Sequence, residues 1–171
     1  MRFAITCQSH YLRHHWALTM QLSSSRWLRE IRFYVAALLP LNLVWEFVQL
    51  PLYEIWTTAK TSQLVFAVLH CTAGDVLIGA SCLVLALLVE GTGEWPYDRF
   101  GAIALLTLAG GLTFTLYSEW HNTAVLHTWA YAPSMPKIAG LGLAPLAQWL
   151  VIPGVIFWRM HVRLTATRTL F

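Results

Sequence analysis

Residues 64–89, LVFAVLHCTAGDVLIGASCLVLALLV, decide the fold class of this chain. The stretch is longer than the ~20 residues that a helix needs to cross a bilayer, and Asp75 is its only Asp, Glu, Lys or Arg. Backbone groups in lipid must bond within their own segment, which favours helices here. Three more hydrophobic segments lie at 33–53, 100–117 and 138–158. We therefore expect an all-α integral membrane protein whose membrane domain, 33–158, is a four-helix transmembrane bundle.

The composition supports this fold class. Of the 171 residues, 57% are hydrophobic and 11% are charged, and the mean hydropathy is +0.57. Soluble domains average about 45–50% apolar and about 25% charged residues, so this chain has too little polar surface to be one. A cytosolic domain, a disordered tail and a nucleic-acid-binding protein are excluded, and the expected partner is the lipid bilayer.

The basic residues predict the orientation of the chain. Five arginines lie in 1–32 and three in 159–171, whereas each connection between spans carries one basic residue. Because Lys and Arg concentrate on the cytoplasmic side of a membrane, both termini are predicted to be cytoplasmic. The connections 53–63 and 118–137 then face outward. The expected location is the cell membrane, as a multi-pass protein, which in a prokaryote is the inner membrane.

Two basic cytoplasmic regions, 1–32 and 159–171, flank the membrane domain. Within the first, 23–32 (SSSRWLREIR) mixes three arginines with large apolar residues, and it is either an interfacial helix or a solvated basic tail. Charged residues interrupt this region, so no cleavable signal is expected, and both Met1 and Met20 are candidate starts. The three cysteines contain no C-x-x-C pair, so neither a disulfide framework nor a zinc finger is predicted.

Polar residues inside the first two predicted spans mark a candidate site, because burying them in lipid is costly. On the first span they recur at helical spacing, on one face: Asn42, Glu46, Gln49 and Tyr53. On the second span Asp75 shares a face with Cys71 and Cys82, and His70 lies beside that face. Gly74 and Gly79 are expected to let a neighbouring helix approach closely.

The third and fourth spans carry polar residues in the same half of the bilayer. A polar face on the third span predicts a helix that continues past the bilayer edge: Gly111, Thr115, Ser118, Glu119 and Asn122. On the fourth span Gln148 lies between Pro145 and Pro153, which weaken or kink a helix. At 1.5 Å per residue, the polar groups of all four spans fall in the outer half. A single polar pocket that opens outward follows.

The connection 118–137 is long enough to cover that pocket. It carries His121, His127, Trp129 and Tyr131, which are either the aromatic wall of a lid or an interfacial belt of the kind that Trp and Tyr form at membrane surfaces.

This constellation suits acid–base or metal-assisted catalysis on a lipid-like substrate. Three carboxyl groups cannot all stay ionised in an apolar bundle without cations, so a shared proton, a histidinium or a divalent metal must compensate. The candidate catalytic residues are Glu46, His70, Asp75 and Glu119. The candidate ligand-binding residues are Asn42, Trp45, Gln49, Asn122, Tyr131 and Gln148. The candidate ligands for a divalent metal, whose presence and identity stay open, are Glu46, His70, Asp75, Glu119 and His121.

Two other functions fit the same residues. Membrane carboxylates and histidines also relay protons or bind ions, although the cytoplasmic halves of the four spans are apolar and offer no polar path for transport. Asn, Gln, Ser and Thr also bond between helices for purely structural reasons. A structural role of this kind accounts for the presence of Asn42, Gln49 and Gln148 in the spans, but it accounts less well for the ionisable side chains of Glu46 and Asp75.

The string WEFVQLP, residues 45–51, resembles a segment of the EXPERA group of membrane proteins, which includes sterol isomerases. The resemblance covers about seven residues and falls in the first span, whereas the group carries it later in the chain. It implies a small helical bundle that binds a sterol-like amphiphile through buried carboxylates, with Glu46 at the position of the glutamate.

The function expected first is therefore that of a small membrane enzyme for a lipid or isoprenoid-like amphiphile. Glu46 or Asp75 would act as acid and base, with His70 as partner and Glu119 at the rim. A non-enzymatic accessory protein that binds a metal or a lipid is the alternative, and a proton or ion transporter is the second alternative. The oligomeric state stays open.

Overall fold

The computed structural model describes residues 3–168, with side chains from 26 to 166. Nearly all of the chain is helical. The elements follow in the order α1 (Phe3–Gln49), the 3-10 turn η1 (Leu50–Leu52), α2 (Ile55–Thr58), α3 (Thr61–Glu90), α4 (Phe100–Trp120), the π-helical turn η2 (His121–Val125), β1 (Lys137–Ile138), β2 (Leu141–Gly142) and α5 (Leu143–Arg168).

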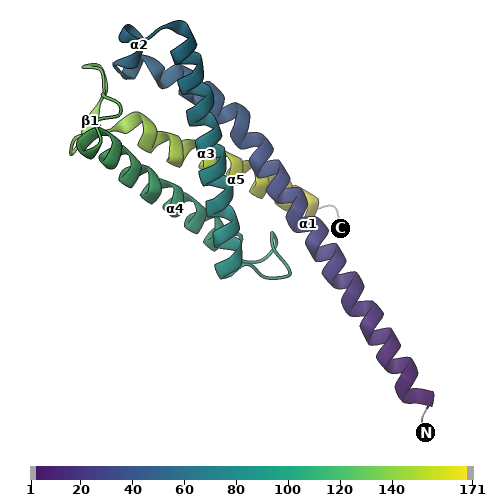
Figure 1. Ribbon diagram of the computed structural model, residues 1–171. Coiled ribbons are helices and arrows are strands. Elements are labelled where there is room, and N and C mark those ends of the chain that lie inside the picture. Colours follow the sequence, from purple (N-terminus) through teal and green to yellow (C-terminus); the bar gives the residue numbers. More distant parts are fainter. Residues whose placement is uncertain (1–2, 169–171) are drawn as a thin grey trace.

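The four long helices form a bundle in which each helix packs against two others. α1 contacts α3 and α5, and α4 contacts the same two helices. α1 and α4 therefore lie on one diagonal of the bundle, and α3 and α5 on the other. The 53–63 and 126–142 connections lie at one end, and the 91–99 connection lies at the end where the chain leaves the bundle (Figure 1).

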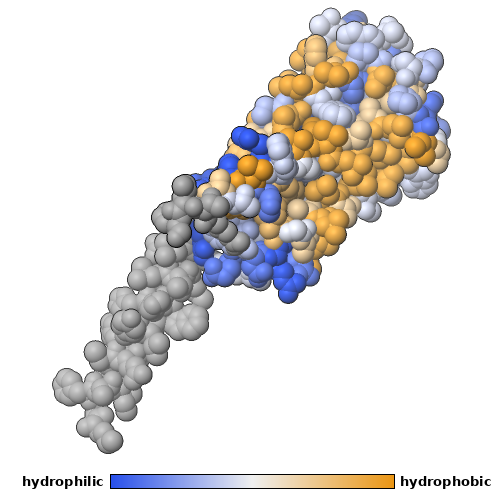
Figure 2. Space-filling model, turned by 180° about the vertical axis from the view of Figure 1, so that it is seen from behind, coloured by the Kyte–Doolittle hydropathy of each residue, from blue (hydrophilic) through white to orange (hydrophobic). Residues whose placement is uncertain are grey.

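Four described helices are long and apolar enough to cross a membrane: Arg26–Leu52, Thr61–Glu90, Phe100–Val125 and Leu143–Ala166. Their outward side chains are apolar, as in Val48 (70% exposed) and Leu88 (75% exposed). Figure 2 shows hydrophobic residues spread over the side of the bundle, with hydrophilic residues gathered toward its two ends. This confirms the predicted count of four apolar helices, and it is the surface expected of a multi-pass membrane protein.

The helix bounds differ from the predicted spans at both ends of the bundle. Segment 23–32 is not a separate helix, because α1 runs through it without a break. Its Trp27 ring packs edge-on against Trp95, with centroids 5.8 Å apart, and Arg26 pairs with Glu94 at 3.6 Å. These contacts tie the end of the basic region to the 91–99 connection.

The fourth long helix begins at Leu143, not at 138. A two-stranded hairpin precedes it, in which Lys137 pairs with Gly142. Its turn uses left-handed backbone conformations at Ala139 (φ 51°) and Gly140 (φ 85°), which a continuing α-helix cannot contain. Hydropathy alone does not detect this turn, because the residues around it are apolar.

An apolar core fills the half of the bundle nearest the chain termini. It contains Tyr34, Leu38, Leu83, Ile103 and Ile156, all at most 2% exposed. Beyond this core, toward the connections, the buried side chains become polar. The fold therefore separates an apolar half from a polar half along the bundle axis.

A buried acidic residue also lies at the terminal end. Glu30 is 1% exposed and accepts hydrogen bonds from Arg29 Nε at 2.9 Å and from Arg163 Nη2 at 3.0 Å. These contacts compensate its charge and join α1 to α5. Glu30 was not predicted as a buried residue, because it lies outside the most hydrophobic part of α1.

Candidate ligand-binding site

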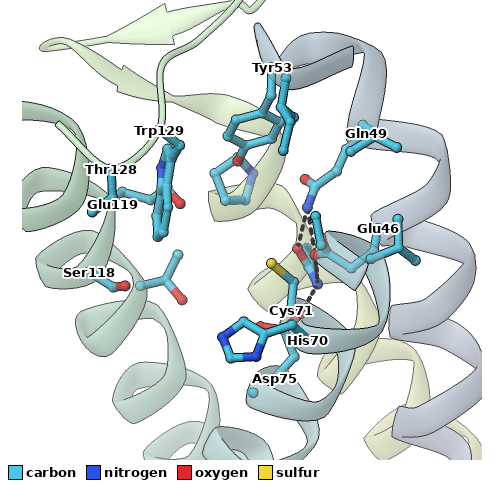
Figure 3. A pocket seen from close by; sticks show the side chains of 18 of the residues that line it. Glu46, Gln49, Tyr53, His70, Cys71, Asp75, Ser118, Glu119, Thr128 and Trp129 are labelled. Atoms are coloured by element: carbon cyan, nitrogen blue, oxygen red, sulfur yellow. Dashed lines mark hydrogen bonds between the residues drawn. The ribbon is translucent and has the colours of Figure 1, made fainter. Parts of the chain in front are cut away.

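A cavity of about 650 Å³ occupies the polar half of the bundle. Small-molecule sites commonly measure about 300–1,000 Å³. All four long helices and the 126–136 loop contribute to its wall. Its polar lining residues are Glu46, Gln49, Tyr53, Ser62, Gln63, His70, Cys71, Asp75, Thr115, Ser118, Glu119, Thr128 and Gln148, and its apolar ones include Phe66, Ile78, Phe114, Trp129 and Trp149. Figure 3 shows Glu46 and Gln49 on one side of the cavity, with Ser118, Glu119 and Trp129 on the other.

An amide and carboxyl network forms one wall of the cavity, and Gln148 of α5 is its centre. The side-chain nitrogen Nε2 of Gln148 lies 2.7 Å from Asp75 Oδ2, 3.1 Å from Glu46 Oε1 and 2.9 Å from Asn42 Oδ1. Gln49 Nε2 lies 2.6 Å from the same Glu46 oxygen and 3.3 Å from Gln148 Oε1. The network thus connects α1, α3 and α5.

The network has more acceptors than donors. The amide of Gln148 carries two hydrogens, yet three oxygens lie within 3.1 Å of its nitrogen. Glu46 and Asp75 are thus brought together at one amide nitrogen, with their nearest oxygens 3.1 Å and 2.7 Å from it. No Lys or Arg lines the cavity to compensate two carboxylate charges at this point.

A second acidic group lies on the other side of the cavity. The hydroxyl of Tyr131 donates a hydrogen bond to Glu119 Oε2 on α4. Burial, and then the hydrogen bond to Glu119, raise the pKa of Tyr131 above its ordinary value. Burial also raises the pKa of Tyr53, followed by the nearby charge of Glu119.

The loop that carries Tyr131 is held against the end of α1. Tyr53 and Tyr131 form an isolated β-bridge, and their rings lie 5.6 Å apart. Glu54 N donates to Ala130 O at 3.0 Å, and Ala132 N donates to Leu52 O at 2.9 Å. Thr128 and Trp129 from this loop line the cavity, so the loop covers the end of the cavity that lies toward the connections.

The cavity opens sideways between α3 and α4. Phe66 on α3 is 66% exposed and Phe114 on α4 is 47% exposed, although both line the cavity. His70 and Cys71 are also exposed lining residues, and the His70 ring stacks on Phe66 with centroids 5.4 Å apart. The opening therefore faces the side of the bundle, where its edge is aromatic.

Gly74 forms part of this cavity and does not make the predicted helix contact. A Cβ atom built on Gly74 would meet nothing within 4 Å, so the missing side chain leaves space in the cavity. At Gly79, by contrast, a Cβ would lie 2.7 Å from Leu38, which fits the expected close approach. The Cys71 side chain lines the cavity, whereas Cys82 packs against Gly110.

Some of the predicted site residues support the cavity from outside its wall. Asn42 and Trp45 bond to the amide network, the latter through Nε1 to Gln49 at 3.1 Å. Asn122 accepts a hydrogen bond from Thr128 Oγ1 at 2.8 Å and so fixes the loop. His121, in the π-helical turn, stacks on Tyr117 of α4 and does not line the cavity.

Other lining residues were missed by the sequence analysis. Phe66, Phe114, Thr128 and Trp149 line the cavity, but apolar side chains and a loop threonine give no signal that separates them from lipid-facing or solvent-facing residues. Among residues 26–166, no group of three or more His, Cys, Asp or Glu side chains is arranged so that it could hold a metal ion.

Comparison with known protein families, with characterised proteins and with solved structures finds no match to this chain. The resemblance of residues 45–51 to the EXPERA group therefore rests on those seven residues alone.

Proposed function

We propose that this protein is a multi-pass membrane enzyme that binds a lipid-like amphiphile in the lateral cavity and performs acid–base chemistry on it with Glu46 and Asp75. The single observation that carries the proposal is the Glu46–Asp75 carboxyl pair, whose members meet at Gln148 Nε2 beside a cavity that opens at the side of the bundle. Buried carboxyl groups without cations are costly, and a purely structural role offers no reason to place them beside empty space.

The charge distribution supports an orientation with both termini in the cytoplasm. Of the basic residues in 26–166, six lie at the terminal end and two at the other: Arg26, Arg29, Arg32, Arg99, Arg159 and Arg163, against Lys60 and Lys137. By the positive-inside rule the terminal end is cytoplasmic. The cavity then lies in the outer half of the bilayer.

The lateral opening suits a substrate that reaches the site from the membrane. Phe66 and Phe114 at its edge offer aromatic contacts to a hydrocarbon chain. Glu119 and Tyr131 lie toward the covered outer end, where the polar head of an amphiphile would rest near the membrane surface. The reactive part of the substrate would then lie beside Glu46 and Asp75.

The carboxyl pair can give and take one proton without any other reactant. In the proposed reaction the protonated member of the pair donates its proton to the substrate, and the other member removes a proton from a neighbouring atom. The pair ends with one proton, as it began. Gln49 and Gln148 hold the carboxylate by donating amide hydrogens to it, which stabilises the charge that develops.

Transport is less well supported by this arrangement. The half of the bundle between the cavity and the terminal end is filled by buried apolar side chains such as Leu38, Leu83 and Ile156. A monomer with this core offers an ion no polar path from the cavity to the cytoplasmic side.

Proton transfer can be tested before the substrate is known. The purified protein is incubated with a total membrane lipid extract in D2O, and mass spectrometry records which lipids gain deuterium. We expect one lipid class to gain deuterium with the wild-type protein and not with Glu46→Gln or Asp75→Asn. Gly74→Leu adds a side chain inside the cavity and keeps both carboxyl residues, so it should also abolish exchange, whereas Gly101→Leu, at an open position on α4 outside the cavity, should not.

The outcome distinguishes an enzyme from a protein that only binds a lipid. A lipid that purifies with the wild-type protein, is lost in Gly74→Leu and gains no deuterium would overturn the enzymatic proposal and leave a lipid-binding accessory protein. Exchange that continues in both carboxyl variants would show that Glu46 and Asp75 are not the acid and base. Circular dichroism of each variant verifies that the helices are retained.

A further inference from the structure

The acidic side chains that line the cavity restrict the charge that the head group of a ligand can carry. Three of the lining side chains are carboxylic acids, Glu46, Asp75 and Glu119, and none is Lys or Arg. His70 is the one basic side chain among these lining residues, and it lies on the exposed α3 wall at the opening. An anionic head group would thus meet acidic groups on both sides of the cavity and find no cation inside it.

The hydrogen-bonding groups around the carboxyl pair also disfavour an anionic head group. Gln148 Nε2 already serves three acceptors, and Gln49 Nε2 serves two. The hydroxyl of Tyr131 is used by Glu119. The amide donors next to Glu46 and Asp75 are thus engaged within the network, while the carboxyl groups retain acceptor positions. A phosphate or carboxylate needs several donors, whereas an amine or a hydroxyl supplies them.

We infer that the cavity selects amphiphiles whose head group donates hydrogen bonds and carries no negative charge, and that it rejects phosphorylated and carboxylate lipids. This inference rests on the proposed function, because it takes the cavity to be a site for an amphiphile. It excludes phospholipids, prenyl diphosphates and fatty acids as ligands. An amine and an alcohol share the required chemistry, and the experiment distinguishes them.

The apolar wall fits the rest of such a molecule. Ile78, Phe114, Trp129 and Trp149 line the cavity with large hydrophobic surfaces. Gly74, next to Asp75 in the chain, leaves open space in the same cavity. A head group beside Glu119, with the rest of the molecule running past the carboxyl pair toward the opening, would place each part of the ligand against a wall of matching polarity.

A matched series of probes tests this selectivity. The protein is reconstituted into nanodiscs that contain, at one mole fraction, the same saturated hydrocarbon chain bearing a primary amine, a hydroxyl, a carboxylate or a phosphate. Its thermal unfolding is followed by tryptophan fluorescence. Ligands that bind the folded state raise the unfolding temperature. Gly74→Leu provides the background for each probe, because any effect of bilayer charge persists when the cavity is filled, and Gly101→Leu controls for the substitution itself.

We expect the amine or the hydroxyl to raise the unfolding temperature of the wild-type protein and of Gly101→Leu, but not of Gly74→Leu. The carboxylate and phosphate probes should produce no shift above that background. This corresponds to binding on the order of tenfold or more weaker than that of the amine or the hydroxyl, because the acidic lining repels a negative charge. In Glu119→Gln, which removes one acidic group, the disadvantage of the carboxylate probe should decrease.

Each result has one meaning. Anionic probes that stabilise the wild-type protein as much as the amine does, in a manner that Gly74→Leu abolishes, overturn the selectivity and leave the proposed function intact. If no probe acts through the cavity, the proposed function itself fails. A shift with the amine alone assigns the site to cationic amphiphiles, and a shift with the hydroxyl alone assigns it to neutral ones.

Discussion

Gln148 on α5 and Asp75 on α3 are joined by a hydrogen bond of 2.7 Å that crosses the centre of the bundle. Their helices lie on a diagonal, because α3 and α5 each pack mainly against α1 and α4. This bond therefore links two helices that share little other contact. It also places the donor of the amide network next to the carboxyl group that we propose as acid or base.

Replacing Gln148 by leucine should destabilise the bundle. The substitution removes the amide that serves Asn42, Glu46 and Asp75, and leaving buried acceptors without a donor costs about 1–3 kcal/mol in the free energy of unfolding. Reversible unfolding in mixed micelles measures this. In a double-mutant cycle, Asp75→Asn should recover part of the loss, because an amide needs less compensation than an acid. Strictly additive effects would contradict the network.

Two glycines should respond to alanine in opposite ways. At Gly111 on α4 a Cβ would lie 2.1 Å from the Trp149 ring, whereas at Gly74 on α3 it would meet nothing within 4 Å. Gly111→Ala should therefore lower the unfolding temperature and disturb the cavity wall that Trp149 forms. Gly74→Ala should be neutral or stabilising, by up to about 0.5–1 kcal/mol, because alanine is the better helix former. Equal effects of the two substitutions would contradict this helix packing.

The stability of the protein should decrease at alkaline pH through Tyr131. Burial and the hydrogen bond to Glu119 raise the pKa of Tyr131, so the folded state holds this proton more tightly than the unfolded chain, whose tyrosine pKa is about 10. The stabilising contribution is then complete below about pH 10 and is lost as the pH rises through the higher folded pKa.

Tyr131→Phe should flatten this alkaline decline. The measurement is the unfolding temperature of wild type and variant from about pH 8 to about pH 11, a range that brackets the ordinary tyrosine pKa. Tyr117→Phe, at a residue that is 57% exposed on α4, is the matched control. A variant that declines as steeply as the wild-type protein would show that the Tyr131–Glu119 contact does not hold the loop.

The ion pair at the terminal end should affect stability and not the cavity. Arg163→Met removes one of the two described partners of Glu30. The loss expected is about 1–2 kcal/mol, less than for a fully buried pair, because the Arg163 side chain is 40% exposed. The probe-induced shifts of the nanodisc experiment should persist, since Glu30 and the cavity lie at opposite ends of the bundle. Arg159→Met, at an exposed position on α5, should leave the unfolding temperature nearly unchanged.

The polar faces of the helices were predictable from spacing. Asn42, Glu46 and Gln49 recur at helical intervals, and a helix with such a face in lipid must turn it toward another helix. Gln148 could be grouped with them because, counted in residues along its predicted span, it falls in the same half of the bilayer. The role of Gly74 was not predictable, since a small residue on a membrane helix serves close packing as readily as open space.

The sequence by itself determined the number of apolar helices, their alternating direction and the end of the bundle at which the polar residues gather. These depend on hydrophobic length and on the rise per residue, which are properties of each segment alone. Only the tertiary structure decided that Glu46 and Asp75 meet at one amide, that Tyr131 reaches Glu119, and that the cavity opens between α3 and α4. Those features depend on the rotation of each helix about its axis and on the path of the 126–136 loop. Contacts between residues far apart in the sequence fix both.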